Sequence, residues 1–191
     1  MPVSTTLNAR VPVVRLTDAI DMAAAYALVD EIALLHDYYQ FRTIDLHIDS
    51  PGGETDALHH IVQSLEPWRK GEGRTLRTLG LNQVASAAAL LLSFGTIGHR
   101  AATAHSRLLY HSVRCINREG LIETVADLRK TSRQLEQWDK RFLDLLSEHS
   151  LHGEGDAIDH KRKLRRLLRQ DRFLTPGQAL DLKLIDRVVQ P

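Results

Sequence analysis

Ser86, His111 and Asp171 carry the three side chains that proteins combine for nucleophilic catalysis. Ser86 stands before an apolar, alanine-rich segment that predicts a buried helix. The free N–H groups and the positive end of a helix stabilise an oxyanion that forms beside a nucleophilic serine. A histidine that takes the serine proton and an aspartate that orients the histidine complete the arrangement. Residues of these three types, if brought together by the fold, could carry out acyl transfer through a serine.

Each of these residues also has a simpler structural interpretation. Ser86 could cap the helix that follows it. His111 ends an expected strand and could be a hydrogen-bonded structural histidine, while Asp171 could form an ion pair with Arg169 or Arg172. Taken singly, the residues favour these structural roles. The sequence around each residue is therefore needed to choose between a structural and a catalytic role.

A sharp turn follows the most regular strand pattern in the chain. Apolar residues alternate with polar ones over 44–48, which predicts a strand. The strand ends at the Ser-Pro-Gly-Gly sequence of residues 50–53. Such a turn bends sharply and can bring backbone N–H groups close to a ligand.

Alternating strands and helices must position these residues. The patterns predict strands over 11–16, 44–48, 74–79, 107–111 and 184–189. They predict helices over 20–35, 57–68, 86–94, 121–146 and 156–170, and a last helix from 175 onward. Asp18 is expected to cap the first helix, and Thr175 and Pro176 to open the last. The alternation favours an α/β fold with a largely parallel sheet, and we expect a single domain over 1–191.

The longest helical pattern, over 121–146, exceeds what a domain of this size needs. At the usual rise per residue it is about 40 Å long. Its apolar residues lie on one side, near heptad spacing. A one-sided helix of this length is expected to pack against something else, such as another subunit.

Four segments, in the same order, resemble motifs of the ClpP family, the proteolytic subunits of Clp proteases. They are the strand and turn over 44–53, the segments 83–89 and 106–111, and the C-terminal stretch 171–186. The segment 83–89 is similar to the family's Gln-Ala-Ala-Ser-Met-Gly-Ala, and 171–175 to its Asp-Arg-Phe-Leu-Ser. The resemblance implies a crotonase-type α/β fold of repeated β-β-α units, with a largely parallel sheet and a protruding handle-like helix over about 121–147.

The resemblance also implies roles for individual residues. Ser86 would be the nucleophile, His111 the base, and Asp171 the group that orients the histidine and stabilises its imidazolium. The backbone N–H groups of Gly53 and Ala87 would form the oxyanion hole. The protein would be a serine endopeptidase that needs no cofactor and no metal, with ATP used only by a partner.

The resemblance implies an assembly as well. The family forms homo-oligomers, as heptameric rings or stacked rings, and cleaves peptides or unfolded proteins. An AAA+ unfoldase delivers its substrates by engaging the N-terminal segment. Here the stretch before residue 11 is short, so that segment is expected to be largely missing and an unfoldase partner is doubtful.

The chain departs from the family pattern at several positions. Asn82 and Lys183 stand where the family has glycine, so left-handed backbone and modest strain are expected there. Ala87 and Ala88 replace Met and Gly, and the segment 114–120 replaces a glycine-rich stretch that binds substrate. The short N-terminal stretch and the altered segment after His111 favour an alternative: a catalytically weak or inactive ClpP-like subunit that serves structurally in a larger assembly.

Three other enzyme classes can be weighed against the same residues. A crotonase-type enzyme acting on acyl-CoA thioesters would share the fold plan, but the Ser86, His111 and Asp171 set argues against it. A Ser–Lys peptidase would need neither the histidine nor the aspartate. The absence of a Gly-x-Ser-x-Gly elbow at Ser86 argues against an α/β-hydrolase.

Composition excludes further classes of function. The chain has 25 Lys and Arg against 24 Asp and Glu, a net charge of +1, so no strong field attracts nucleic acid or anionic membrane. The basic run 161–166 reads as the solvated face of an amphipathic helix, without interleaved aromatic residues. One cysteine and no apolar leader or membrane-length segment indicate a soluble, cytoplasmic protein.

One group of residues has the spacing of metal ligands, namely Glu148, His149 and His152. No further ligand accompanies them in the sequence, so no metal site is expected.

Overall fold

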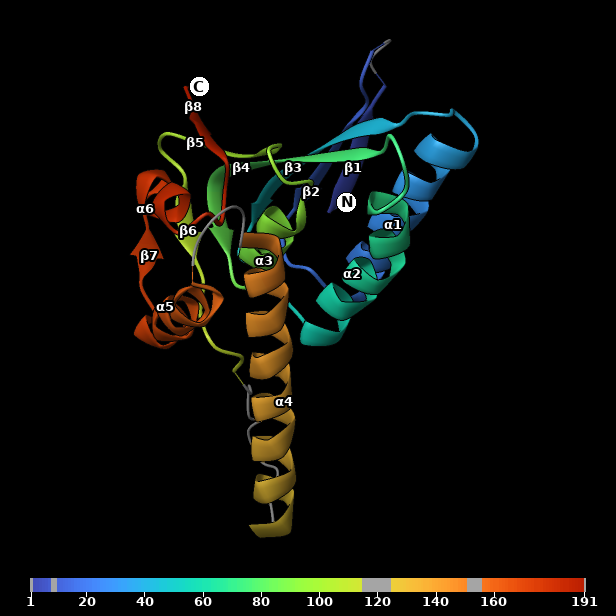
Figure 1. Ribbon diagram of the computed structural model, residues 1–191. Helices are drawn as coiled ribbons and strands as arrows, with labels where there is room; N and C mark the ends of the chain where they lie inside the picture. The colour runs from blue at the N-terminus through green and yellow to red at the C-terminus, as the bar shows by residue number, and fades with distance from the viewer. Residues whose placement is uncertain (1, 8–9, 115–124, 151–155, 191) are drawn as a thin grey trace.

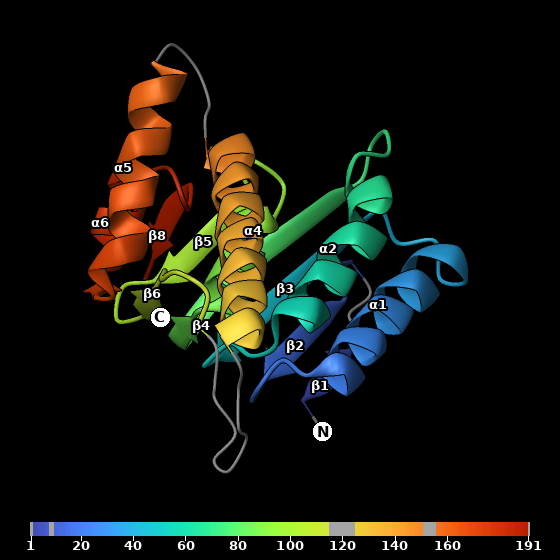
Figure 2. The same ribbon diagram turned by 90° about the horizontal axis from the view of Figure 1, so that it is seen from below.

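A largely parallel sheet with helices packed against it forms the body of the protein. The computed structural model describes residues 2–7, 10–114, 125–150 and 156–190 of the chain. Seen from below, the helices α1, α2 and α4 lie in front of the sheet, and α5 and α6 lie beside its last strand (Figure 2). The predicted α/β fold class is confirmed.

The sheet has the strand order β1-β2-β3-β4-β5-β8, with β6 paired to β4 and β7 paired to β6. Its strands are β1 (Val3–Thr6), β2 (Val13–Thr17), β3 (Thr43–Ser50), β4 (Thr75–Ala85), β5 (Arg100–Thr103), β6 (Arg107–Leu109), β7 (Phe173–Leu174) and β8 (Arg187–Val189). The β1–β2 and β6–β7 pairs are antiparallel, and the other pairs are parallel. Because β4 is long enough to pair with β3, β5 and β6, its end lies at the centre of the fold.

The strand β1 corrects the expectation that 11–16 is the first strand. It pairs antiparallel with β2, with Val3 opposite Leu16. The prediction missed β1 because its sequence is short and mostly polar, without an apolar alternation that marks a strand. The stretch before residue 11 therefore supplies an edge strand of the sheet.

The helices are α1 (Met22–Asp37), α2 (Thr55–Arg69), α3 (Ala87–Phe94), α4 (Val125–Ser150), α5 (Ala157–Gln170) and α6 (Pro176–Asp181). Figure 1 shows α4 leaving the sheet and extending far beyond the other described elements. Residues 121–124 of the predicted long helix lie outside the described residues, and the helix continues to Ser150. Thr175 caps α6 and Pro176 begins it, as predicted, and Gln178 adds a capping box that was not predicted.

Asp21, rather than Asp18, caps the first helix. The Asp21 side chain accepts a hydrogen bond of 2.8 Å from the Ala24 N–H. Asp18 instead has a left-handed backbone, with a φ of 63°, and its carbonyl accepts a hydrogen bond of 2.5 Å from the Ser50 hydroxyl. This bond ties the chain after β2 to the turn after β3.

One continuous hydrophobic core joins the sheet to the helices. The inward residues of β3, Ile44, Leu46 and Ile48, are fully buried, as their alternation predicts. The helix α3 is buried on every side, as expected from a sequence that is apolar except for Ser93. The core therefore encloses α3, and the position of its first residues is determined by packing all around.

A fully buried arginine connects four parts of the fold. The Arg100 side chain donates hydrogen bonds to both carboxylate oxygens of Asp186, at 2.6 and 2.9 Å. It also donates to the carbonyl oxygens of Ser93, His149 and Lys183. These acceptors belong to α3, to the end of α4 and to the turn before β8, so Arg100 holds all three in place.

Replacing Arg100 with methionine should lower the free energy of unfolding by about 3–5 kcal/mol, because Asp186 loses its buried partner. Urea denaturation measures the change. The matched control is Arg77→Met, which breaks an Arg–Asp pair whose arginine side chain is 36% exposed. We expect about 1 kcal/mol or less for the control. Equal losses in the two variants would contradict the central role of Arg100.

His149 is a buried base at the end of α4. It is 2% exposed, its ring lies 5.2 Å from that of Phe94, and its Nε2 atom makes no hydrogen bond to any residue that the structure describes. Burial lowers the pKa of His149 from 6.5 to about 4, and the positive charge of Arg69 acts in the same direction. The folded chain therefore keeps this ring neutral where the unfolded chain binds a proton.

We expect the free energy of unfolding to fall as the pH is lowered from about 6.5 towards 4, because only the unfolded chain protonates His149 in that range. Urea denaturation at a series of pH values measures this slope. His149→Leu should flatten it, whereas the same substitution at the exposed His105 should not. An unchanged slope in His149→Leu would show that other groups control the acid sensitivity.

Candidate functional site

Ser86 occupies a strained junction between β4 and α3. Its backbone has a φ of 57° and a ψ of −126°, which is unfavourable for a residue with a Cβ atom. The Ser86 N–H donates to the Leu109 carbonyl at 2.8 Å, and the Ser86 carbonyl accepts from the Ala89 N–H at 3.0 Å. The side chain makes no capping hydrogen bond. Ser86 therefore occupies the N-cap position of α3, as the structural interpretation expects, but its side chain does not cap the helix, and its hydroxyl has no hydrogen-bond partner among the described residues.

The Ser-Pro-Gly-Gly turn passes directly over Ser86. Gly52 has a φ of 95°, and a Cβ atom there would lie 2.5 Å from the Ala85 carbonyl oxygen and 2.6 Å from the Ser86 Cβ. At Gly53 a Cβ atom would lie 2.1 Å from the Ile20 carbonyl oxygen. Both glycines are needed because the turn touches neighbouring backbone on two sides.

Hydrogen bonds hold the backbone on both sides of Gly53. The Gly52 carbonyl accepts from the Ile20 N–H at 2.8 Å, and the Ile20 carbonyl accepts from the Glu54 N–H at 2.8 Å. Ala87 is the first residue of α3, a position whose N–H has no acceptor within the helix. Of the two residues predicted to form an oxyanion hole, Gly53 thus lies in a hydrogen-bonded turn and Ala87 at the start of the buried helix α3.

One cavity brings four of the five predicted site residues together. It has a volume of about 760 Å³, and Gly53, Ser86, Ala87 and His111 line it. Its apolar wall comes from Leu90 of α3 and from Trp138 and Phe142 of α4. Asp21, Glu54 and Asp56 add carboxylates to its lining. Asp171 does not line this cavity.

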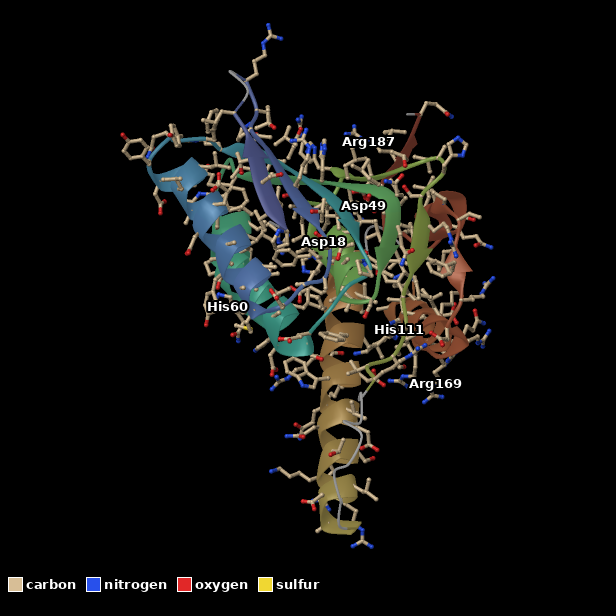
Figure 3. The ribbon with its side chains drawn as sticks, turned by 180° about the vertical axis from the view of Figure 1, so that it is seen from behind. Asp18, Asp49, His60, His111, Arg169 and Arg187 are labelled. Atoms are coloured by element: carbon tan, nitrogen blue, oxygen red, sulfur yellow. The ribbon has the colours of Figure 1, made fainter. Side chains whose placement is uncertain are left out.

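His111 follows β6 and lies where α4 and α5 approach one another (Figure 3). Its Nδ1 atom is 2.6 Å from the carbonyl oxygen of Ser112. A carbonyl can only accept, so Nδ1 carries the proton, and in the neutral ring Nε2 is then an acceptor. No hydrogen bond joins His111 to Ser86 or to Asp171, all three of which the structure describes.

Asp171 ends α5 in a left-handed conformation, with a φ of 50°, and its side chain is half exposed. Its carboxylate forms an ion pair with Arg114. The two partners named from the sequence are not used: Arg172 donates to the side chain of Gln170, and Arg169 makes no ion pair with Asp171. The ion-pair partner of Asp171 is thus Arg114, which does line the cavity.

The expected left-handed positions are confirmed. Asn82 has a φ of 41° and Lys183 a φ of 57°. The Asn82 side chain donates to Asp49 at 2.7 Å, and Asp49 also accepts from the Gln83 N–H at 3.2 Å. Figure 3 shows Asp49 on the face of the sheet away from the helices. This bridge between β3 and β4 steadies the strand that leads to Ser86.

Two residues of the site escaped sequence reasoning. Trp138 lies on α4 with its ring 5.2 Å from that of His59 and 5.7 Å from that of Phe142, and forms part of the cavity wall. Arg114 reaches Asp171 from a segment without regular structure. The residues next to them in the sequence do not indicate either role, because each role depends on a contact with an element distant in sequence.

The expectations for other kinds of site can be compared with the described residues. Glu148 lies 3.7 Å from Lys70, His149 packs in the core, and His152 lies outside the described residues. No group of three or more His, Cys, Asp or Glu side chains is arranged to hold a metal in the described ranges. In the basic helix α5 the apolar residues Leu164, Leu167 and Leu168 are buried, which confirms its amphipathic character.

None of the helices within the described residues combines the length and the apolar character needed to cross a bilayer.

Comparisons with known proteins identify the family. A family model described as Clp protease matches residues 3–191. The chain belongs to the Clp protease family, which places it among the peptidases. The ATP-dependent Clp protease proteolytic subunit 4 of Rhodococcus jostii is 32% identical over 183 residues, covering 96% of this chain and 86% of that protein. The ATP-dependent Clp protease proteolytic subunit 2 of Thermobifida fusca is 30% identical over 180 residues, covering 93% and 80%.

Substituting alanine at Gly52 should lower the reactivity of Ser86 toward a fluorophosphonate probe by about 100-fold. The added Cβ atom displaces Ser86, and a shift of about 1 Å in a reacting group has an effect of that size. The rate of labelling, followed by intact mass, measures it. The control is Gly98→Ala, where φ is 83° but no atom lies within 4 Å of the new Cβ. Equal labelling of the two variants would contradict the close contact as the cause.

Proposed function

We propose that this protein is a serine endopeptidase that cleaves peptide bonds through an acyl-enzyme on Ser86. The observation that carries the proposal is the strained position of Ser86, whose unbonded side chain lines a cavity shared with His111. Backbone strain of this kind is kept where the surrounding structure over-determines it, which is common at active sites. Membership of the Clp protease family supports the same reading.

The proposed mechanism uses the proton positions that the site favours. The Nε2 atom of His111 takes the proton of the Ser86 hydroxyl as its oxygen attacks the peptide carbonyl. The N–H groups of Gly53 and Ala87 stabilise the oxyanion, each contributing about 100- to 1,000-fold to the rate. His111 then returns the proton to the leaving amine. Water, activated by the same histidine, hydrolyses the ester and regenerates Ser86. Asp171 is the proposed third member, which stabilises the imidazolium when it faces His111.

A second function has its own supporting observation. Asp171 is paired with Arg114, and His111 donates to the Ser112 carbonyl instead of to a carboxylate. A subunit with its catalytic groups arranged in this way permanently would be inactive and serve a structural role in a larger assembly. The two functions share the fold and differ in whether Ser86 reacts.

We further propose that the protein works as a homo-oligomeric ring, acts on peptides or unfolded proteins, and needs no cofactor of its own. The family relationship supports the ring. The long helix α4 supports it too, because it exposes Leu128 on a stretch that projects from the body (Figure 1). An AAA+ unfoldase is a candidate partner, since the relatives named above are described as ATP-dependent. A cytoplasmic location fits the single cysteine.

Labelling with a fluorophosphonate probe, combined with native mass measurement, tests the proposed activity. We expect the assembled wild type to be labelled and Ser86→Ala to be unlabelled. His111→Ala should react at least 100-fold more slowly, because the base is lost. Ser132→Ala, which changes an exposed serine on α4, should behave as the wild type.

The same experiment distinguishes the two proposed functions. A folded, assembled wild type that does not react would overturn the enzyme and favour the structural subunit. Labelling that persists in Ser86→Ala would assign the reaction to another serine and contradict the site.

A further inference from the structure

The segment after β6 is held in place by two helices. The Ser112 N–H donates to the Leu168 carbonyl of α5 at 2.9 Å. The Val113 N–H donates to the Asp139 carboxylate of α4 at 2.6 Å. These two bonds define the course of the backbone up to Arg114, whose side chain then reaches the Asp171 carboxylate at the end of α5.

This arrangement separates Asp171 from the histidine that it is proposed to serve. The His111 Nδ1–H is taken by the Ser112 carbonyl, which fixes the same tautomer that a carboxylate would fix. A carbonyl is neutral, however, and stabilises the imidazolium less than a carboxylate does. The Arg114 guanidinium at the same time neutralises the charge of Asp171. The site thus has the correct tautomer of His111, but the Nδ1–H is bonded to a carbonyl and not to a carboxylate.

We propose that Arg114 is an autoinhibitory latch, which holds Asp171 in an ion pair and keeps it from His111 until the pair opens. This inference rests on the proposed function, because it assumes that His111 acts as the base for Ser86. In the latched state the Ser112 carbonyl orients His111 and the enzyme reacts slowly. In the open state Asp171 accepts the His111 Nδ1–H, and the imidazolium gains its counter-charge.

The latch is weak enough to be reversible. The Arg114 and Asp171 side chains are 58% and 50% exposed, and ion pairs with such exposure are screened by salt. A weak pair shifts the population between the two states without locking one of them. Removing it should therefore raise the rate of Ser86 labelling by only about two- to fivefold.

The first test compares labelling rates of Arg114→Gln and the wild type as oligomers of equal native mass. We expect Arg114→Gln to react two- to fivefold faster at low salt, and added salt to accelerate the wild type but not the variant. Arg114→Lys keeps the charge and should stay close to the wild type. Arg172→Gln is the matched control, because it removes a positive charge next to Asp171 that makes no ion pair with it. A rate in Arg114→Gln equal to or below that of the wild type would overturn the latch.

A double-mutant cycle shows whether Arg114 acts through Asp171. In the Asp171→Asn background there is no carboxylate to release, so Arg114→Gln should no longer accelerate labelling. An equal acceleration in both backgrounds would assign the effect to probe access to the cavity, which Arg114 also lines, and would contradict the latch.

A measurement independent of activity separates the failure of the latch from the failure of the proposed function. Proton NMR of Ser86→Ala reports whether the His111 Nδ1–H is bonded to a carboxylate, since such a proton is strongly deshielded. The signal should be absent in Ser86→Ala, appear when Arg114→Gln is added, and vanish again with Asp171→Asn. If no variant is labelled but the signal appears, the latch stands and the peptidase fails. If the signal does not appear, the latch is wrong, whatever the labelling shows.

Discussion

The buried guanidinium of Arg100 links parts of the fold that lie far apart in the chain. A charge in the core must be fully hydrogen-bonded, and Arg100 meets this requirement with the Asp186 carboxylate and three backbone carbonyls. One of these acceptors is the carbonyl of His149, near the end of α4. The base of the long helix is therefore anchored beside α3, and Trp138, further along α4, is held against the cavity.

The site depends on a second constraint, the close approach of the Ser-Pro-Gly-Gly turn to the start of α3. Gly52 touches the backbone around Ser86 without room for a methyl group, and the chain after β2 is bonded to the same turn through Asp18 and Ser50. Packing on all sides of α3 resists any relaxation of the strained Ser86 backbone. The contacts that bury α3 thus also place Ser86 at the cavity.

Different elements of the fold place the other two members of the predicted triad. His111 is placed by β6, while Asp171 is placed by α5, and the segment between them in space is bonded to both α4 and α5. These two helices therefore hold the segment whose Ser112 carbonyl accepts the His111 Nδ1–H. The ion pair of Arg114 and Asp171 joins exposed side chains, so its opening does not affect the core.

The sequence by itself determined the features that depend on neighbouring residues. The alternation in β3, the helix cap at Thr175, the left-handed backbone at Asn82 and the α/β order of elements follow from local pattern and steric preference. The motif order also identified Ser86 and His111, which the fold brings to one cavity. Only the tertiary structure decided the edge strand β1, the cap at Asp21, the cavity wall at Trp138 and the pairing of Asp171 with Arg114. The last two join segments that are distant in the chain. The pairing of the polar strand β1 and the choice of Asp21 over Asp18 as the helix cap depend on packing and hydrogen bonds, which leave no pattern in the neighbouring sequence.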